Sequence, residues 1–446
     1  MTDATAERLT RPRVVILGGG FGGLYAAQAL RHSEVEVVLV DRTNHHLFQP
    51  LLYQVATATL APTDIVAPLR WLVRKQSNTD VVFGEVRAVD SAGKQVHLTD
   101  GRTIPYNYAI LALGARHSYF GHPQWEAVAP GLKSIDDAIE IRRRFLLAFE
   151  RADAATTPDE RDEWLTMVVI GAGPTGVELA GMLPTVARRA LPRDFHHIDT
   201  AKTRVILLEG GPRILPTFPA DLAERARTDL EHLGVEVRVN ARVTGVADGR
   251  VDIGAERIRA HTILWAAGNE ASPIARTLGT PLDAVGRVLV EPDLSVPGHP
   301  ELFVVGDLAV MTTDGKPVPG VAPAAMQSGR SAAANILRTV RRQSRRPFGY
   351  RNKGDLATIG RYRAIAVIGG VELSGPFAWW TWLFVHILYL AGFRNRLSVL
   401  VQWGYSFFTY ERGARLIQHA RGSTPDYPIS EGSARSNAPP NRPSAP

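Results

Sequence analysis

The stretch Val14-Val-Ile-Leu-Gly-Gly-Gly-Phe-Gly-Gly23 decides the fold. The continuous apolar run over residues 14–17 predicts a buried strand, residues 18–23 predict a tight turn, and residues 24–32 predict a helix. A further apolar run over residues 35–40 predicts the next strand. Strand, glycine turn, helix and strand in this order are typical of an α/β fold with a parallel sheet.

Three glycines in this turn, Gly18, Gly20 and Gly23, follow the spacing G-x-G-x-x-G. The first glycine permits the tight turn, the second lets a pyrophosphate approach the backbone, and the third lets the helix pack closely on the strand. Asp41 ends the second strand, where a carboxylate accepts hydrogen bonds from a ribose diol. This unit therefore predicts a Rossmann-type dinucleotide site.

A second unit of the same kind begins 153 residues later. Residues 167–170 predict a buried strand, Gly171, Gly173 and Gly176 repeat the glycine spacing, and a helix is expected from Val177. One such loop is a weak signal, because many glycine-rich turns bind nothing. Two loops, each between a buried strand and a helix, predict two dinucleotide sites.

The second unit also indicates which nucleotide it binds. Residues 204–208 predict its second strand, which ends at Glu209. A carboxylate there repels the 2′-phosphate of NADP and therefore favours NADH. Arg213 lies close to Glu209 in the sequence and could bind the 2′-phosphate, so NADPH remains an alternative nucleotide.

Composition excludes several classes of protein. With 446 residues, the chain is long enough for two or three domains. Because it has no cysteine, it has no disulfide, zinc thiolate site or redox dithiol. No nucleic-acid-binding motif accompanies its net charge of +7. The first apolar run is too short for a signal peptide, and we expect the protein on the cytoplasmic side.

The C-terminal part is basic and apolar together. Residues 338–421 contain 14 Lys/Arg against three acidic residues, a local net charge of +11. Residues 376–393 have no formal charge, and residues 397–410 form a second apolar block. Tryptophans at one end, Tyr389 near the other, and Arg394 and Arg396 directly afterwards favour two short helices on a bilayer surface. A membrane span and an ordinary buried core remain alternatives.

Other segments carry weaker signals. Residues 81–89 and 94–98 predict hairpin strands, and so do residues 235–246 and 250–253. Residues 136–155 predict a helix, and residues 156–161 predict a boundary loop. Residues 423–446 are rich in proline, serine and asparagine and predict a disordered tail.

Three further motifs make the chain resemble a known superfamily. Leu111-Ala-Leu-Gly114, Trp265-Ala-Ala-Gly268 and Phe303-Val-Val-Gly-Asp307 are similar to motifs of the two-dinucleotide flavoproteins. Within that superfamily, the sequence most resembles the type II NADH:quinone oxidoreductases, which do not pump protons. The resemblance spans about residues 12–420 and includes His46–Ala56, Val177–Gly181, Pro319–Gln327, Trp382–His386 and Gly392–Arg396.

The resemblance implies FAD in the first unit, NADH in the second and a membrane quinone as acceptor. It implies catalytic roles near the nicotinamide, flavin and quinone for Glu178, Gln327 and Lys353. It implies FAD contacts for Pro50, Gln54, Gly114, Asp307 and Ala324, and a nucleotide-site position for Gly268. The chain departs from the family at Pro323, where many relatives carry a glutamine that contacts quinone, and Gln327 remains.

Structural roles are open for two of these residues. Glu178 lies in the first turns of a helix, where the helix dipole favours a carboxylate without any function. Lys353 is also compatible with a solvated lysine before a strand. His386, within the apolar block, is interpreted as a hydrogen-bonded or interfacial histidine.

We therefore expect two Rossmann-type domains followed by a C-terminal helical segment on the membrane surface. The predicted domains are residues 12–155 and 276–345 for FAD, 156–275 for NADH, 346–420 for membrane association and 421–446 for the tail. The predicted protein is a peripheral, monotopic oxidoreductase on anionic lipid that transfers two electrons from NADH to quinone; a homodimer is left open. A soluble NADH oxidase, a reductase of a soluble carrier and a flavin-bearing NADH sensor are the alternatives.

Overall fold

The computed structural model describes residues 11–390, 393–409 and 415–417, and the tail predicted for residues 421–446 lies outside these residues. Its first domain is a six-stranded sheet with the order β20-β21-β9-β1-β2-β5. The strands are β1 (Arg13–Leu17), β2 (Glu36–Asp41), β5 (Thr79–Phe83), β9 (Tyr108–Leu111), β20 (Ser295–Val296) and β21 (His299–Val304). All neighbours pair in parallel except β20 and β21. Strands from two parts of the chain, residues 13–111 and 295–304, thus form one sheet.

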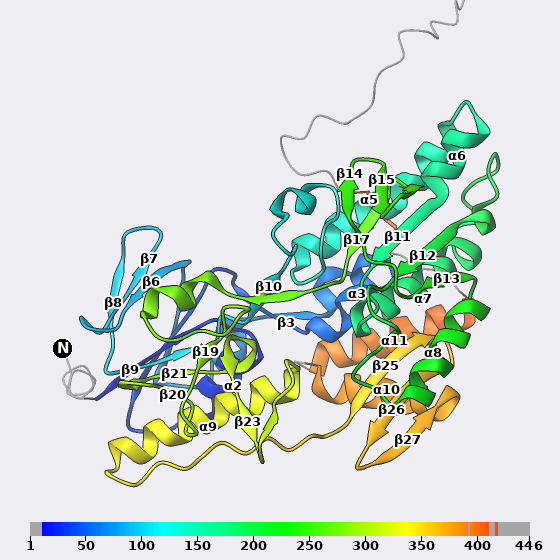
Figure 1. Cartoon of the computed structure of the whole chain (residues 1–446). Helices are drawn as coiled ribbons and strands as arrows, with labels where there is room; N and C mark the ends of the chain where they lie inside the picture. The colour runs from blue at the N-terminus through cyan, green and yellow to red at the C-terminus, as the bar shows by residue number, and fades with distance from the viewer. Residues whose placement is uncertain (1–10, 391–392, 410–414, 418–446) are drawn as a thin grey trace, which may run out of the picture.

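Two helices of this domain pack closely together (Figure 1). They are α2 (Phe21–Ala29) and α9 (Ala322–Val340). A Cβ on Gly329 would lie 2.1 Å from the carbonyl oxygen of Gly22, so only glycine permits this helix separation. The close contact fixes the N-terminal half of α9 beside the first glycine loop.

The second domain contains a four-stranded parallel sheet with the order β13-β12-β11-β17. Its strands are β11 (Thr166–Ile170), β12 (Arg204–Leu208), β13 (Val235–Arg238) and β17 (Thr262–Trp265). The helices α7 (Pro174–Arg189) and α8 (Ala220–His232) follow β11 and β12. Two strands, β10 (Ala115–His117) and β18 (Asn269–Ala271), pair antiparallel between the two domains, as Figure 1 shows.

Smaller elements surround the two sheets. They include β3 (His45–Leu47), η1 (Gln49–Leu51), α3 (Leu52–Ala56), η2 (Pro62–Asp64), β4 (Val66–Pro68), α4 (Leu69–Val73), β6 (Val86–Asp90), β7 (Gln95–Leu98), β8 (Thr103–Pro105), α5 (Ile135–Ala154), β14 (Gly245–Ala247), β15 (Arg250–Ile253) and β16 (Glu256–Arg259). The sheets β6-β7-β8 and β14-β15-β16 are antiparallel.

Three local predictions are wrong. Residues 81–89 divide between β5, in the parallel sheet, and β6, in the antiparallel one; residues 235–246 divide in the same way between β13 and β14. The predicted boundary loop contains the start of helix α6 (Pro158–Leu165). Thr157 caps α6 by accepting a hydrogen bond from the Glu160 N–H, and proline at the first helical position needs no donor.

The C-terminal domain is a sheet with two helices. The antiparallel strands β25 (Asp355–Gly360), β26 (Arg363–Ile368) and β27 (Val371–Ser374) precede α10 (Gly375–Tyr389) and α11 (Phe393–Thr409). The sheet packs on α7, where a Cβ on Gly181 would lie 1.9 Å from the carbonyl oxygen of Ile359. Within the described ranges, no helix has the length and apolarity needed to cross a membrane.

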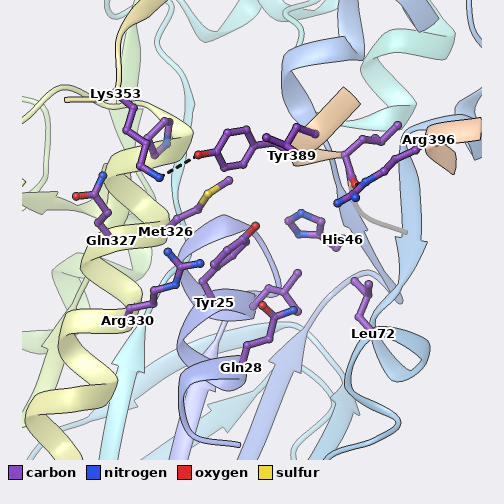
Figure 2. A pocket seen from close by; sticks show the side chains of 14 residues that line it. Tyr25, Gln28, His46, Leu72, Met326, Gln327, Arg330, Lys353, Tyr389 and Arg396 are labelled. Atoms are coloured by element: carbon purple, nitrogen blue, oxygen red, sulfur yellow. Dashed lines mark hydrogen bonds between the residues drawn. The ribbon is translucent and has the colours of Figure 1, made fainter. Parts of the chain in front are cut away.

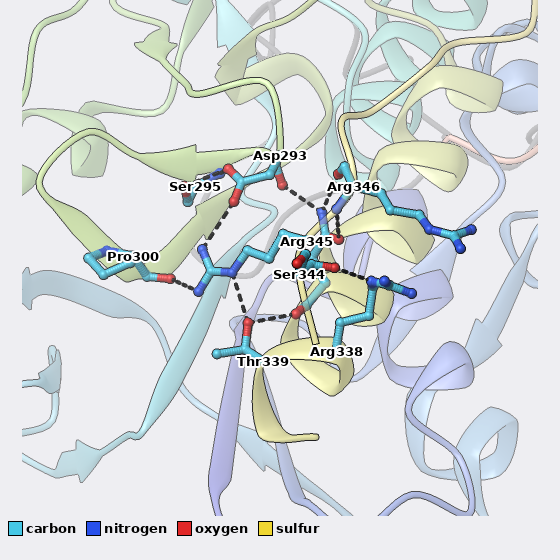
Figure 3. A network of polar contacts seen from close by, with 9 residues as sticks. Asp293, Ser295, Pro300, Arg338, Thr339, Ser344, Arg345 and Arg346 are labelled. Atoms are coloured by element: carbon cyan, nitrogen blue, oxygen red, sulfur yellow. Dashed lines mark hydrogen bonds and ion pairs between the residues drawn. The ribbon is translucent and has the colours of Figure 1, made fainter. Parts of the chain in front are cut away.

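An arginine clamp joins α9 to the first domain before the chain enters the C-terminal sheet (Figure 3). Arg345 donates to Asp293 at 3.1 Å, to the Pro300 carbonyl at 2.7 Å and to the Thr339 hydroxyl at 2.8 Å. Its guanidinium also lies 4.9 Å from the Phe303 ring centroid. Because one side chain links three segments, the route from α9 to β25 is held against the first sheet.

Candidate active site

The first glycine loop has a constrained and an open part. Gly18 has a φ of +100°, and its N–H donates to the Val40 carbonyl at 2.8 Å. A Cβ on Gly23 would lie 1.8 Å from the Gly18 carbonyl oxygen, whereas a Cβ on Gly20 would meet nothing within 4 Å. Gly18 and Gly23 therefore shape the turn, and Gly20 leaves the backbone open to a ligand, as a pyrophosphate site needs.

The second glycine loop repeats this geometry. Gly171 has a φ of +99°, and its N–H donates to the Leu208 carbonyl at 2.7 Å. A Cβ on Gly176 would lie 1.8 Å from the Gly171 carbonyl oxygen, and a Cβ on Gly173 would meet nothing within 4 Å. Each loop leads into a helix whose N-terminal N–H groups favour a phosphate, so both loops fit a dinucleotide.

The carboxylates that end the second strands are bound to these loops. Asp41 accepts from the Gly19 N–H at 2.5 Å, and Glu209 accepts from the Ala172 N–H at 2.8 Å. Asp41 also accepts from the backbone N–H and the hydroxyl of Thr43, and Glu209 also accepts from the Gly211 N–H at 2.7 Å. Each carboxylate therefore has an oxygen that accepts only one N–H and can accept a further donor. The side chain of Arg213 is exposed, and its guanidinium donates to the Pro216 carbonyl at 2.7 Å.

Asp307 lies where the first sheet meets α9. A Cβ on Gly320 would lie 3.3 Å from its carboxylate, and burial raises the pKa of Asp307 while Lys133 and Arg287 oppose the shift. The Gly306 N–H donates to the Ser328 hydroxyl at 3.1 Å, which holds this turn against α9 near Ala324. Sequence reasoning missed Lys133, because no motif marks a lone lysine before a helix.

Pro50 and Gln54 lie in η1 and α3. Gln54 is buried, donates to the Tyr53 hydroxyl at 2.9 Å and accepts from the Trp403 indole N–H at 2.8 Å. The side chain predicted to lie near flavin is thus bound to α11, a contact between residues 349 positions apart. In the sequence, Trp403 belongs only to an apolar block, and no local pattern indicates its contact with Gln54.

A second polar contact joins α11 to the same region. Asp64 is buried and accepts from the Ser398 hydroxyl at 2.9 Å, from the Gln402 amide at 3.0 Å and from the Ala61 N–H at 2.8 Å. Buried carboxylates require such partners. α11 is therefore seated on the protein by specific hydrogen bonds as well as by apolar contact.

Glu178 lies in the first turns of α7 and faces the C-terminal sheet. Its side chain is half-buried, and burial raises the pKa of its carboxyl well above the ordinary value, while the backbone N–H of Thr358 opposes that shift. A carboxyl of raised pKa beside a nucleotide loop is a candidate for proton or charge chemistry. Thr358 lies in strand β25 of the C-terminal domain, and the glycine motif alone does not indicate that Glu178 contacts this strand.

Gln327 and Lys353 come together at a cavity of about 460 Å³ between α2, α9 and α10 (Figure 2). Gln327 exchanges two hydrogen bonds of 3.0 Å with the Arg351 backbone, and Lys353 donates to the Tyr389 hydroxyl at 3.0 Å. Pro323 also lines the cavity. It is the second residue of α9, where a missing N–H breaks no helical bond.

Two histidines stabilise the surroundings. His46 is buried and its Nδ1 lies 2.9 Å from the Gly19 carbonyl oxygen. His386 stacks on Trp382 with ring centroids 4.3 Å apart, and burial lowers its pKa to about 4. Burial also lowers the pKa of His46, which favours the neutral form of both hydrogen-bonded rings. No cluster of His, Asp or Glu in the described part of the chain could hold a metal ion.

Comparisons with known families agree with this arrangement. Residues 12–329 match the pyridine nucleotide-disulphide oxidoreductase family, and residues 352–410 match the NDH2 C-terminal domain. The type II NADH:quinone oxidoreductase NdhA of Mycobacterium tuberculosis is 46% identical over 91% of this chain and 89% of its own length. A second enzyme of that organism, Ndh, is 44% identical over 93% of this chain and 92% of its own length.

Solved structures share the fold. NDH2 from Plasmodium falciparum in complex with NADH has a TM-score of 0.83 at 19% identity, covering 92% of this chain and 100% of that one. A sulfide:quinone oxidoreductase from Aquifex aeolicus has a TM-score of 0.69 at 18% identity, covering 92% of this chain and 96% of that one. This chain has no cysteine for such sulfur chemistry. By family match and by identity to both mycobacterial enzymes, the chain belongs to the type II NADH:quinone oxidoreductases.

Proposed function

We propose that the chain oxidises NADH and reduces a membrane quinone, with the first glycine loop holding FAD and the second holding NADH. The two loops of matching geometry carry this proposal, because each leaves one glycine open to a pyrophosphate. FAD supplies hydride acceptance and two-electron transfer when bound. The chain supplies binding, orientation and charge. The domain division at residues 12–155, 156–275, 276–345 and 346–420 is part of the same proposal.

On the nucleotide side, Glu209 fixes the adenosine ribose and Gly173 admits the pyrophosphate. Glu178 then lies near the nicotinamide, two residues after the last glycine of the loop. Oxidation of NADH creates positive charge on the nicotinamide. A carboxylate at Glu178 stabilises that charge, and because burial raises the pKa of Glu178, this stabilisation increases as the pH rises.

On the quinone side, one end of the cavity is lined by Pro323, Met326 and Gln327, from the N-terminal half of α9, and by Lys353. Reduction of a quinone places negative charge and then protons on its oxygens. The Lys353 ammonium, held by Tyr389, stabilises that charge. Gln327 is oriented by the Arg351 backbone and supplies the polar contact that Pro323 lacks.

The membrane contact is proposed for the exposed face of α10 and α11. Phe377, Phe384 and Leu388 of α10 are 79%, 67% and 53% exposed, and they share the face with Trp380. Leu397, Leu400 and Val401 extend the exposed apolar surface onto α11. Such a face beside a local charge of +11 suits the anionic cytoplasmic surface of a membrane. A second copy of the chain is the competing occupant.

Substitution on this face tests the membrane contact. Deleting the chain from residue 376 would also remove Ala378 and Trp382, which are buried, so single residues are the better target. The double variant Phe377→Ser/Phe384→Ser should lose cosedimentation with vesicles and turnover of long-chain quinones while flavin reduction by NADH persists. Phe83→Ser is the matched control, since Phe83 is 61% exposed on the remote strand β5.

The alternatives make different predictions. A soluble NADH oxidase or carrier reductase needs no apolar face, and the double variant would then retain full turnover. If the variant becomes monomeric from a dimeric wild type, the face is a dimer surface. A flavin-bearing sensor would reduce its flavin with NADH but fail to turn over with any quinone.

A further inference from the structure

We propose that the end of the cavity formed by Tyr25, Gln28, Arg330 and Arg396 binds the phosphate headgroup of an anionic phospholipid. This inference rests on the proposed membrane contact and adds a specific lipid site to it. The cavity lies between α2, α9 and the turn from α10 to α11, and Figure 2 shows Tyr25, Gln28 and Arg330 together at one side with Arg396 across from them.

Three cations face this space. Arg330 comes from α9, Arg396 from α11 and Lys353 from the segment before β25. The guanidinium of Arg330 lies 4.6 Å from the Tyr25 ring centroid, and Arg396 donates to the Leu390 carbonyl at 2.8 Å. No Asp or Glu lines the cavity, and within the described ranges none of the three cations forms an ion pair.

The same three cations act on the hydroxyl of Tyr25. Burial raises the pKa of its hydroxyl, and Arg330, Arg396 and Lys353 each act to lower it. An uncompensated group of cations in a half-enclosed space favours an anion, and arginine in particular favours phosphate oxygens.

The position of the site identifies the kind of anion. Leu388 lines the cavity and also belongs to the exposed apolar face of α10. Leu72 and Leu390 supply further apolar wall. A headgroup phosphate can therefore bind the arginines while its acyl chains leave along the face that contacts the membrane. Free phosphate would gain nothing from these leucines.

The site is built into the packing of the fold. The contact of Gly329 with Gly22 holds α2 and α9 together at a distance that no side chain allows. Arg330 directly follows Gly329, and Tyr25 comes one helical turn after Gly22. Their separation is thus fixed without a ligand, which reduces the entropic cost of binding.

Binding of soluble lipids to the FAD-loaded protein tests the site. Calorimetric titration should compare dihexanoyl phosphatidylglycerol, dihexanoyl phosphatidylcholine and inorganic phosphate. Phosphatidylglycerol should bind most tightly, because the cavity has no carboxylate for choline and free phosphate lacks acyl chains. Arg330→Gln should weaken phosphatidylglycerol binding by about tenfold, as expected for loss of one charge-assisted hydrogen bond.

Three variants make the test specific. Arg330→Lys should restore part of the affinity, since it keeps the charge but loses the planar fork. Arg396→Gln should weaken binding as Arg330→Gln does. Arg87→Gln removes an equal charge at an exposed position of β6 and should leave phosphatidylglycerol binding unchanged. Equal affinity of wild type and Arg330→Gln, or phosphate binding as tight as phosphatidylglycerol, would overturn the proposal.

Two further measurements separate this proposal from the function. If a short-chain quinone displaces phosphatidylglycerol competitively, the whole cavity is a quinone site and the lipid assignment is wrong. Turnover of NADH with quinone by the wild type in phosphatidylcholine vesicles tests the proposed function without the anionic lipid. A wild type that turns over normally in these vesicles but binds no phosphatidylglycerol in the calorimetric titration would reject only the headgroup site.

Discussion

The two glycine loops have almost the same backbone and different surroundings. Gly18 and Gly171 have φ values of +100° and +99°, and each third glycine would bring a Cβ to 1.8 Å from a carbonyl oxygen. α2 nevertheless packs on α9, whereas α7 packs on β25. Two residues after the third glycine, α2 carries Tyr25 and α7 carries Glu178. The two loops thus share the backbone geometry that a pyrophosphate site needs, and the helices that follow them differ in side chains and packing partners.

The largest effects are expected from substitutions that disrupt each glycine loop separately. Gly176→Ala should lower kcat/KM for NADH by about a hundredfold or more, because a methyl group 1.8 Å from the Gly171 carbonyl forces the loop to move. The protein should still be yellow. Gly23→Ala should instead lose FAD, measured by flavin absorbance after purification. A Gly176→Ala protein that oxidises NADH normally would refute the assignment of the second loop.

Substitutions at the two open glycines, Gly20 and Gly173, separate loss of nucleotide binding from loss of stability. Gly20→Ala and Gly173→Ala add a methyl group where nothing lies within 4 Å. Their thermal stability without nucleotide should stay near that of the wild type, while FAD affinity falls for the first and NADH affinity for the second. Equal loss of stability in all four variants would mean that the glycines serve folding alone.

A smaller effect is expected at the carboxylates. Glu209→Gln should raise the KM for NADH by about tenfold and narrow the preference over NADPH, because the ribose contact weakens and the 2′-phosphate is no longer repelled. Asp41→Asn should leave both KM values nearly unchanged and weaken FAD instead. Steady-state kinetics with both nucleotides measures this. A wild type that prefers NADPH would contradict the assignment of Glu209.

The third expected effect depends on pH. Because the pKa of Glu178 is raised in the folded protein, the neutral form persists above the ordinary range, and flavin reduction by NADH should accelerate as rising pH charges the carboxyl. Glu178→Gln should remove this step from the pH profile, measured by stopped-flow absorbance. A Glu178→Gln profile with the same inflection as the wild type would exclude Glu178 as its source.

The same shift has a consequence for stability. The folded state binds the Glu178 proton more tightly than the unfolded state, so the wild type loses stability as the pH rises from the unfolded pKa toward the folded one. Glu178→Gln should therefore melt higher than the wild type at neutral pH, and this difference should vanish in acid. Thermal unfolding of the nucleotide-free protein measures it.

The smallest expected effect is at the contact between α11 and α3. Trp403→Phe removes the hydrogen bond to Gln54 and leaves a buried amide oxygen without that donor, at a cost of about 1–3 kcal/mol of stability. Turnover with quinone should fall several-fold, with flavin reduction by NADH unchanged. Trp380→Phe, on the exposed face, is the control. Equal effects of both substitutions would argue against a specific role for Trp403.

The sequence predicted the parts of the fold that depend on local rules. Both glycine loops, their terminal carboxylates and the two C-terminal helices follow from spacing and hydropathy. The hydrogen bond between Gln54 and Trp403, the binding of Asp64 by α11 and the proximity of Lys133 to Asp307 did not, because distant segments meet without any periodic signal. The expected strand over residues 81–89 is wrong because alternating hydropathy does not show that one strand ends at Phe83 and a strand of another sheet begins at Val86.

One anaerobic titration tests the central claim most directly. FAD-loaded protein in phosphatidylcholine vesicles is mixed with a limiting amount of NADH and an excess of long-chain quinone, and NAD⁺ and quinol are quantified together. The account predicts equimolar NAD⁺ and quinol, and initial formation of both by the Gly176→Ala variant that is slower by about a hundredfold or more. Formation of NAD⁺ without quinol, or an equal initial rate of quinol formation by that variant, would contradict it.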